Sequence, residues 1–245
     1  MTLDSRDPAP SAAGDLQDKE LVQLQGVVCL MGGFPALAGL DLTVGSGEIV
    51  GLRGANGAGK TTVLRLCAGL VTLSRGSGSV LGHDLGTRAG RRSTRKAVGL
   101  LGHDTSLYDD LTVEQNVRFW ARANRAAEPD VLAAMDHLGV AGRVATVKVA
   151  GLSAGQRRRT ALAILVARRP RLWLLDEPHA GLDHDGRNLL DQLLMDAAAA
   201  GATIMVATHD VGRIDDILTR TVIVHGGTVH EHPIRPIGRP GGTDV

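Results

Sequence analysis

The feature that most constrains this chain is the run GANGAGKT at residues 54–61. It matches the pattern G-x-x-x-x-G-K-[ST], in which glycines let the backbone wrap around phosphate oxygens and point N–H groups at them. The apolar run EIVGLR precedes the loop, and the helical pattern TTVLRLCAGL follows it. A helix that begins at the loop adds the positive end of its dipole. The chain is therefore predicted to contain a strand, a phosphate-binding loop and a helix in succession.

Side chains of this loop are expected to add to what its backbone provides. Lys60 supplies a positive charge for the β- and γ-phosphates of a nucleotide, and Thr61 offers a hydroxyl to Mg²⁺. We therefore predict a nucleotide-phosphate site formed by Gly54, Ala55, Asn56, Gly57, Ala58, Gly59, Lys60, Thr61 and Thr62.

A second element of the same site is expected at residues 172–177, LWLLDE. Four apolar residues followed by two carboxylates indicate a buried strand with acids at its carboxyl end, where ligands bind in open α/β sheets. Asp176 is predicted to hold Mg²⁺, and Glu177 to polarise an attacking water. An acidic helix cap is the competing interpretation, and the phosphate loop upstream argues against it.

Strands and helices are expected to alternate along the chain. We predict an α/β fold, a P-loop NTPase core with a mostly parallel sheet, together with an N-terminal β region. A helical lobe is expected to be inserted over about residues 104–159, where helical patterns dominate. The expected strands are residues 22–30, 40–44, 48–53, 98–101, 171–175, 203–208 and 222–224, and the expected helices are residues 60–70, 112–121, 129–138, 153–168 and 184–200.

Composition limits the domain plan and the possible partners. Residues 1–20 and 233–245 are expected to be flexible tails around one domain at residues 21–232.

A net charge of +1, a pI near 7.9 and 2% aromatic residues argue against a nucleic-acid partner. No apolar run approaches the ~18 residues that span a bilayer, and no secretory signal is visible. We therefore expect a cytosolic chain that docks onto a membrane partner.

A third motif, LSAGQ at residues 152–156, narrows the class. A serine hydroxyl, a glycine and a helix N-terminus can form a second phosphate-binding surface, although a plain serine cap would explain the same letters. With this motif the chain resembles the ATPase subunit of an ABC transporter over residues 22–230. LSAGQ resembles the family signature with Ala154 in place of a glycine, Asp183 in AGLD resembles its D-loop, and His209 in VATHD resembles its switch histidine.

The resemblance implies how these residues work together. Two cassettes, in a homodimer or a pair, would face each other head to tail with ATP and Mg²⁺ between them. Glu177 would be the general base, and His209 would hydrogen-bond the γ-phosphate. Ser153 and Gly155, with Gln156 beside them in the LSAGQ motif, would contact the nucleotide bound to the partner cassette. Asp183 would line the interface between the two cassettes. Integral membrane subunits would contact residues 104–120, and the chain would lie peripherally on the cytoplasmic side of the cell membrane.

Two positions depart from the common family pattern. His103 stands where most members carry a glutamine that reaches Mg²⁺ and the attacking water. A neutral imidazole can accept or donate a hydrogen bond there, but a surface histidine that has lost this role remains the alternative. Met31 stands at the position of the usual adenine-stacking aromatic residue, with Phe34 nearby.

The departures favour one subfamily. His103 after LG, the LSAGQ motif followed by arginines, and LW before LLDEP resemble the haem-exporter ATP-binding subunit of cytochrome c maturation. The ATPase of an unrelated drug or lipid exporter remains an alternative. A soluble ABC ATPase of translation or repair fits less well, because such chains usually carry two cassettes or a long insertion. A small-molecule kinase would not need LSAGQ.

Overall fold

The computed structural model describes residues 20–209 and 214–232, and a mostly parallel sheet forms its centre. The strand order is β10-β9-β3-β8-β7-β6. Neighbours from β9 to β6 run parallel, and only the edge strand β10 is antiparallel. The strands are β3 (Ile49–Arg53), β6 (Val98–Leu101), β7 (Leu172–Asp176), β8 (Thr203–Ala207), β9 (Arg220–His225) and β10 (Thr228–His232). Every residue of β7 and β8 is buried, as continuous apolar runs predict.

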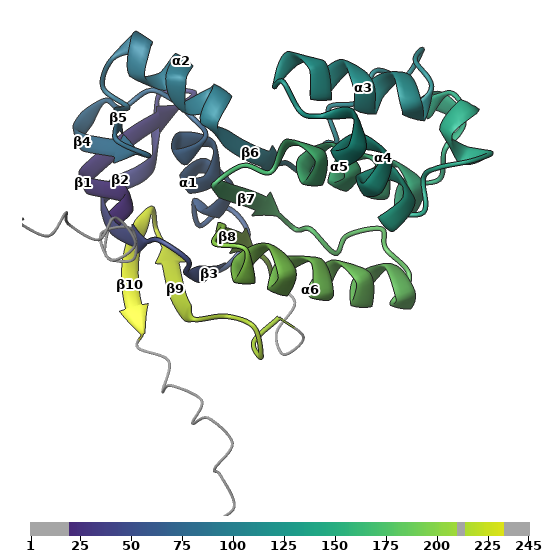
Figure 1. Cartoon of the computed structure of the whole chain (residues 1–245). Coiled ribbons are helices and arrows are strands. Elements are labelled where there is room, and N and C mark those ends of the chain that lie inside the picture. The colour runs from purple at the N-terminus through teal and green to yellow at the C-terminus, as the bar shows by residue number, and fades with distance from the viewer. Residues whose placement is uncertain (1–19, 210–213, 233–245) are drawn as a thin grey trace, which may run out of the picture.

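A second, antiparallel sheet confirms the predicted N-terminal β region. Its order is β2-β1-β4-β5, with β1 (Glu20–Met31), β2 (Phe34–Gly45), β4 (Arg75–Val80) and β5 (His83–Asp84). β1 and β2 form a long hairpin whose tip pairs Met31 with Phe34. Apolar residues of this sheet share one buried cluster with α1 (Lys60–Cys67), so the second sheet packs against the helix that follows the phosphate loop (Figure 1).

The remaining helices divide between the central sheet and a lobe beside it (Figure 1). α3 (Val113–Ala123) and α4 (Glu128–His137) pack on α5 (Ala154–Arg168), with short 3₁₀ turns at Val144–Thr146 and Val149–Gly151. Capping boxes begin both α3, at Thr112 with Gln115, and α5, at Ser153 with Gln156. α6 (His184–Ala199) belongs to the same buried cluster as the lobe, so one core joins the lobe to the sheet.

Several elements were not predicted from the sequence. α2 (Arg88–Ala97), with the sequence RAGRRSTRKA, repeats its five basic residues at helical spacing but has no stripe of large apolar residues, which is the signal used to predict the other helices. β4 is the glycine-containing run RGSGSV, and β5 has two residues. β10 was also missed. α1 is shorter than predicted and ends at Cys67, and β2 begins at Phe34 instead of residue 40. The predicted tails at residues 1–20 and 233–245 lie outside the described residues, except for Glu20, which begins β1.

The fold places four loops at one edge. Parallel strands end at the same edge of a sheet, so the segments after β3, β6, β7 and β8 meet there. Within the two described stretches, no helix is long and apolar enough to cross a membrane.

Candidate nucleotide site

The phosphate loop has a backbone that only glycine accommodates at key points. Gly54 and Gly59 have φ angles of 147° and 115°. A Cβ on Gly54 would lie 2.1 Å from the carbonyl oxygen of Val224, and one on Gly59 would lie 2.9 Å from that of Ala36. The loop therefore winds tightly against β9 and β2, at points where only glycine fits.

Lys60 and Thr61 stand at the start of α1 and close the loop. The Lys60 side chain is buried, and its Nζ donates to the carbonyl oxygens of Gly54 at 2.7 Å and Ala55 at 3.1 Å. The Thr61 hydroxyl donates to Oδ2 of Asp176 at 2.8 Å. Hydroxyl and carboxylate oxygens are ligands that Mg²⁺ takes. This pair of oxygens fits a magnesium ion beside bound phosphates.

A cavity of about 280 Å³ brings most of the predicted residues together. Its walls come from the phosphate loop, the end of β7, the loop after β6 and β2. The residues that line it are Ala36, Asn56, Gly57, Ala58, Gly59, Lys60, Thr61, Thr62, His103, Asp176 and Glu177. His103 therefore lines the same cavity as the phosphate loop, Asp176 and Glu177.

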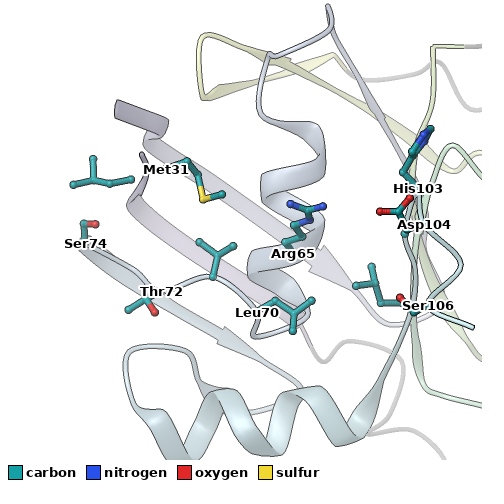
Figure 2. A pocket seen from close by; sticks show the side chains of 12 residues that line it. Met31, Arg65, Leu70, Thr72, Ser74, His103, Asp104 and Ser106 are labelled. Atoms are coloured by element: carbon teal, nitrogen blue, oxygen red, sulfur yellow. The ribbon is translucent and has the colours of Figure 1, made fainter. Parts of the chain in front are cut away.

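His103 also borders a second cavity, of about 640 Å³ (Figure 2). This second cavity is lined by Met31 at the end of β1, Arg65 in the last turn of α1 and Leu70 in the loop after α1, together with Asp104 and Ser106 (Figure 2). Phe34 lies at the hairpin tip with 78% of its surface exposed. The role of Met31 or Phe34 toward adenine stays a prediction.

Glu177 is held in a strained position next to the phosphate loop. Its φ of 47° lies in the left-handed region, which costs a non-glycine residue free energy. Its backbone N–H donates to the Ala207 carbonyl at 2.8 Å, fixing β7 to β8 beyond the ladder. Its carboxylate accepts from the Thr208 hydroxyl at 3.2 Å and from the His209 amide at 3.1 Å. Nδ1 of His209 lies 2.8 Å from Oε1 of Glu177.

Thr208 and Arg158 are site residues that the sequence did not identify. Arg158 is 3% exposed, and its guanidinium donates to backbone carbonyls at the ends of β6 and β7. Burial lowers the pKa of Arg158 below its ordinary value, whereas the charges of Asp176 and Glu177 raise it. The arginine run at residues 157–159 was a visible signal, but its letters do not say which arginine points inward.

The remaining predicted residues lie apart from the cavity in the described chain. Ser153 and Gln156 cap α5 reciprocally, with hydrogen bonds of 3.0 and 3.2 Å. Asp183 accepts from the Gly186 amide at 2.8 Å and from Arg159 at 2.9 Å, and these two partners lower the pKa of its carboxyl. A Cβ on Gly155 would lie 3.0 Å from the carbonyl oxygen of Gly181, so the LSAGQ and AGLD segments pack together.

The fold and the site define a class of protein. A family model described as "ABC transporter" matches residues 37–180, more than half of the chain. The chain belongs to the ABC transporter family and is an ATP-hydrolysing, nucleotide-binding subunit.

Among proteins of known name, the chain is similar in sequence to ATP-binding proteins of cytochrome c biogenesis. The cytochrome c biogenesis ATP-binding export protein CcmA of Rhodopseudomonas palustris is 39% identical over 185 residues, which cover 76% of this chain and 90% of the relative. The protein of the same name from Aliivibrio fischeri is 35% identical over 193 residues, or 77% of this chain and 92% of the relative.

Solved structures share the fold. The ATP-binding cassette MJ0796, described as a dimer in a post-hydrolysis state bound to ADP and Pi, has a TM-score of 0.79 and 26% identity. The match covers 88% of this chain and 100% of that one. CbiO1 from Clostridium perfringens, described as part of an ABC transporter complex, has a TM-score of 0.74 and 26% identity, with 87% of this chain and 88% of that chain covered.

The position of His103 in the cavity wall generates a prediction. His103→Ala should lower the turnover of ATP more than it lowers ATP affinity, because a contact to the metal-bound water matters most as charge develops. We expect a turnover loss on the order of 10- to 100-fold, as for other residues that orient metal ligands. His103→Gln should keep much of the activity. Steady-state ATPase assays and ATP titrations measure both quantities, and wild-type turnover in His103→Ala would assign the residue to the surface.

Proposed function

We propose that Glu177 and His209 carry out ATP hydrolysis at the phosphate cavity. The observation that carries the proposal is the contact between the Glu177 carboxylate and Nδ1 of His209, at 2.8 Å, beside the loop that holds Lys60. A carboxylate is an acceptor for the proton of a water, and an imidazole is a donor to a phosphate oxygen. These two groups follow adjacent strands, β7 and β8, so the sheet fixes their spacing.

In the proposed reaction, each residue of the site has one role. The amides of residues 54–61 and Nζ of Lys60 bind the β- and γ-phosphates. Glu177 takes a proton from a water as the water oxygen bonds to the γ-phosphorus and the bond to ADP breaks. His209 donates a hydrogen bond to the γ-phosphate and keeps that water in line. Thr61 and Asp176 would hold Mg²⁺, which neutralises charge on the phosphate oxygens when bound. His103 would orient water beside Mg²⁺ when the ion is bound.

A second cassette completes the proposed site. Ser153 caps α5 and Gly155 lies in its first turn, and neither residue lines the phosphate cavity of its own chain. Paired head to tail, they would contact the γ-phosphate on the partner, with Gln156 and Asp183 at the interface. The dimeric state recorded for MJ0796 supports this arrangement.

Separating the base from phosphate binding tests the mechanism. Glu177→Gln keeps the shape but removes the base, so ATP should still bind while turnover falls by about 10³-fold or more, toward background. An ATP-dependent dimer should then accumulate in size-exclusion chromatography. Lys60→Ala should instead weaken ATP binding and give no such dimer. Equal behaviour of the two variants would contradict this division of roles.

A membrane partner is proposed to dock on the lobe segment at residues 104–120. Asp104 and Ser106 line the second cavity with Leu70, and Ser106 and Trp120 line an adjoining cavity of about 330 Å³. Tyr108 and Phe119 are each 46% exposed and stack edge to face, with ring centroids 5.2 Å apart. Exposed aromatic groups beside a hollow are typical of protein interfaces. We place the chain peripherally on the cytoplasmic side of the membrane through this contact.

Fractionation tests the docking surface. Made alone, the chain should stay in the supernatant after ultracentrifugation, and made with its membrane subunits it should sediment with membranes. Tyr108→Glu with Phe119→Glu should release it into the supernatant, because buried carboxylates without partners oppose docking. ATP affinity of the purified variant should be unchanged. Sedimentation of the chain by itself, or retention of the double variant on membranes, would contradict the proposal.

The physiological process proposed is cytochrome c maturation. Relatives named for cytochrome c biogenesis cover most of the chain at 35–39% identity, and His103, LSAGQ and LWLLDEP lie within the matched region. Haem is attached outside the cytosol, so this subunit would act by driving a membrane partner through cycles of cassette closure and reopening. The exporter of another substrate, such as a drug or lipid, is the alternative.

A deletion strain distinguishes these alternatives. Loss of the chain should remove covalently bound c-type haem, detected by haem staining of denaturing gels, while proteins with non-covalent haem stay near normal. The wild-type chain should restore the staining, and Glu177→Gln should not. Normal c-type cytochromes in the deletion strain would exclude the proposed process and leave the alternative exporter.

A further inference from the structure

We propose that Arg158 is a positioning residue that sets the spacing between the His103 loop and the Glu177 carboxylate. This inference deepens the proposed function and depends on it, since it assigns a new residue to the same reaction. Among the described residues, the hydrogen bonds of Arg158 go to backbone carbonyls and not to the side chains that are proposed to touch ATP. It acts on the backbone that carries two of them.

The contacts of Arg158 join three segments. Nη1 donates to the carbonyl of Gly102 at 2.7 Å, directly before His103. Nη2 donates to the carbonyl of Asp176 at 2.8 Å and to that of Glu177, and Nε donates to the carbonyl of Pro178 at 3.1 Å. One guanidinium thus bridges the end of β6, the end of β7 and the helix α5 that carries it.

These carbonyls lie where the hydrogen bonds between β6 and β7 have ended, so Arg158 supplies a connection that the strands do not. β6 and β7 are hydrogen-bonded along Val98–Leu101 and Leu172–Leu175, and the ladder stops there. His103 and Glu177 both lie beyond the last pair, and both line the phosphate cavity. The Arg158 bridge therefore continues the β6–β7 connection past the ladder, at the level of the reacting groups. A shift of about 1 Å there is enough to slow a positioned reaction.

The planar shape of the guanidinium is essential to this role. Its N–H groups point in fixed, diverging directions and can serve carbonyls on two strands at once, whereas the ammonium of lysine is a compact donor at one point. Burial strengthens these hydrogen bonds, because water does not compete for the carbonyls. Arg158→Lys keeps the charge but removes the bridge.

Another arginine of α5 gives a matched control. Arg168 is also largely desolvated, which lowers its pKa, and Nη2 donates to the Val98 carbonyl at 3.0 Å. Val98 is at the opposite end of β6 from Gly102. Arg168→Gln therefore removes a partly buried hydrogen bond between α5 and β6 that lies away from the nucleotide site.

The test measures turnover, ATP affinity and thermal unfolding of the full chain. Arg158→Lys should lower kcat on the order of 10- to 100-fold, as residues that orient a reacting group do, and change the Kd for ATP by less than about threefold. Arg158→Gln should show the same separation. Arg168→Gln should keep kcat near wild type. In single-turnover assays, Arg158→Lys should add little to the loss caused by Glu177→Gln, because both act on the same step.

Three results would contradict the positioning role of Arg158, and a fourth would contradict the proposed base. Turnover of Arg158→Lys equal to that of Arg168→Gln would overturn the proposal. So would a joint fall of kcat, ATP affinity and the unfolding midpoint, or loss of folding in both Arg158 variants, since these assign Arg158 to stability alone. Full turnover in Glu177→Gln would instead overturn the proposed role of the base, whatever Arg158→Lys does.

Discussion

Parallel strands that end at one edge of the central sheet are the constraint on which the nucleotide site depends. The phosphate loop follows β3, His103 follows β6, Asp176 and Glu177 end β7, and His209 follows β8. The register pairs Asp176 with Ala207, so the last residues of β7 and β8 are level. Groups separated by more than a hundred residues therefore reach one cavity without any long loop to place them.

Buried charge at that edge is balanced by polar contacts. Lys60, Asp176 and Arg158 are each less than 10% exposed. Isolated charges in such places would be costly, but each has partners: loop carbonyls for Lys60, the Thr61 hydroxyl for Asp176 and strand-end carbonyls for Arg158. The site is thus preorganised, with donors and acceptors already facing each other. Preorganised polar groups of this kind are what stabilises developing charge during phosphoryl transfer.

The phosphate loop and the acidic strand end could be predicted from the sequence because each is encoded by a short run of neighbouring residues. Residues 54–61 encode a loop conformation by glycine spacing, and LWLLDE encodes a buried strand with acids at its end. α2 was missed because it lies on the surface with no apolar stripe, and only Thr87, whose hydroxyl caps Gly90 at 3.0 Å, marked its start. Arg158 was missed because its partners are backbone carbonyls, which leave no trace in the letters. Its neighbours Arg157 and Arg159 instead pair with Asp109 and Asp183.

Diffraction from crystals of Glu177→Gln grown with ATP and Mn²⁺ tests the central claim most directly, that one sheet edge assembles the phosphate and metal site. Anomalous scattering locates the manganese without reference to any assumed geometry. The account predicts one manganese peak in contact with the Thr61 hydroxyl, on the side of Asp176, and phosphates enclosed by residues 54–61. Manganese away from Thr61, or phosphates bound outside that loop, would contradict it.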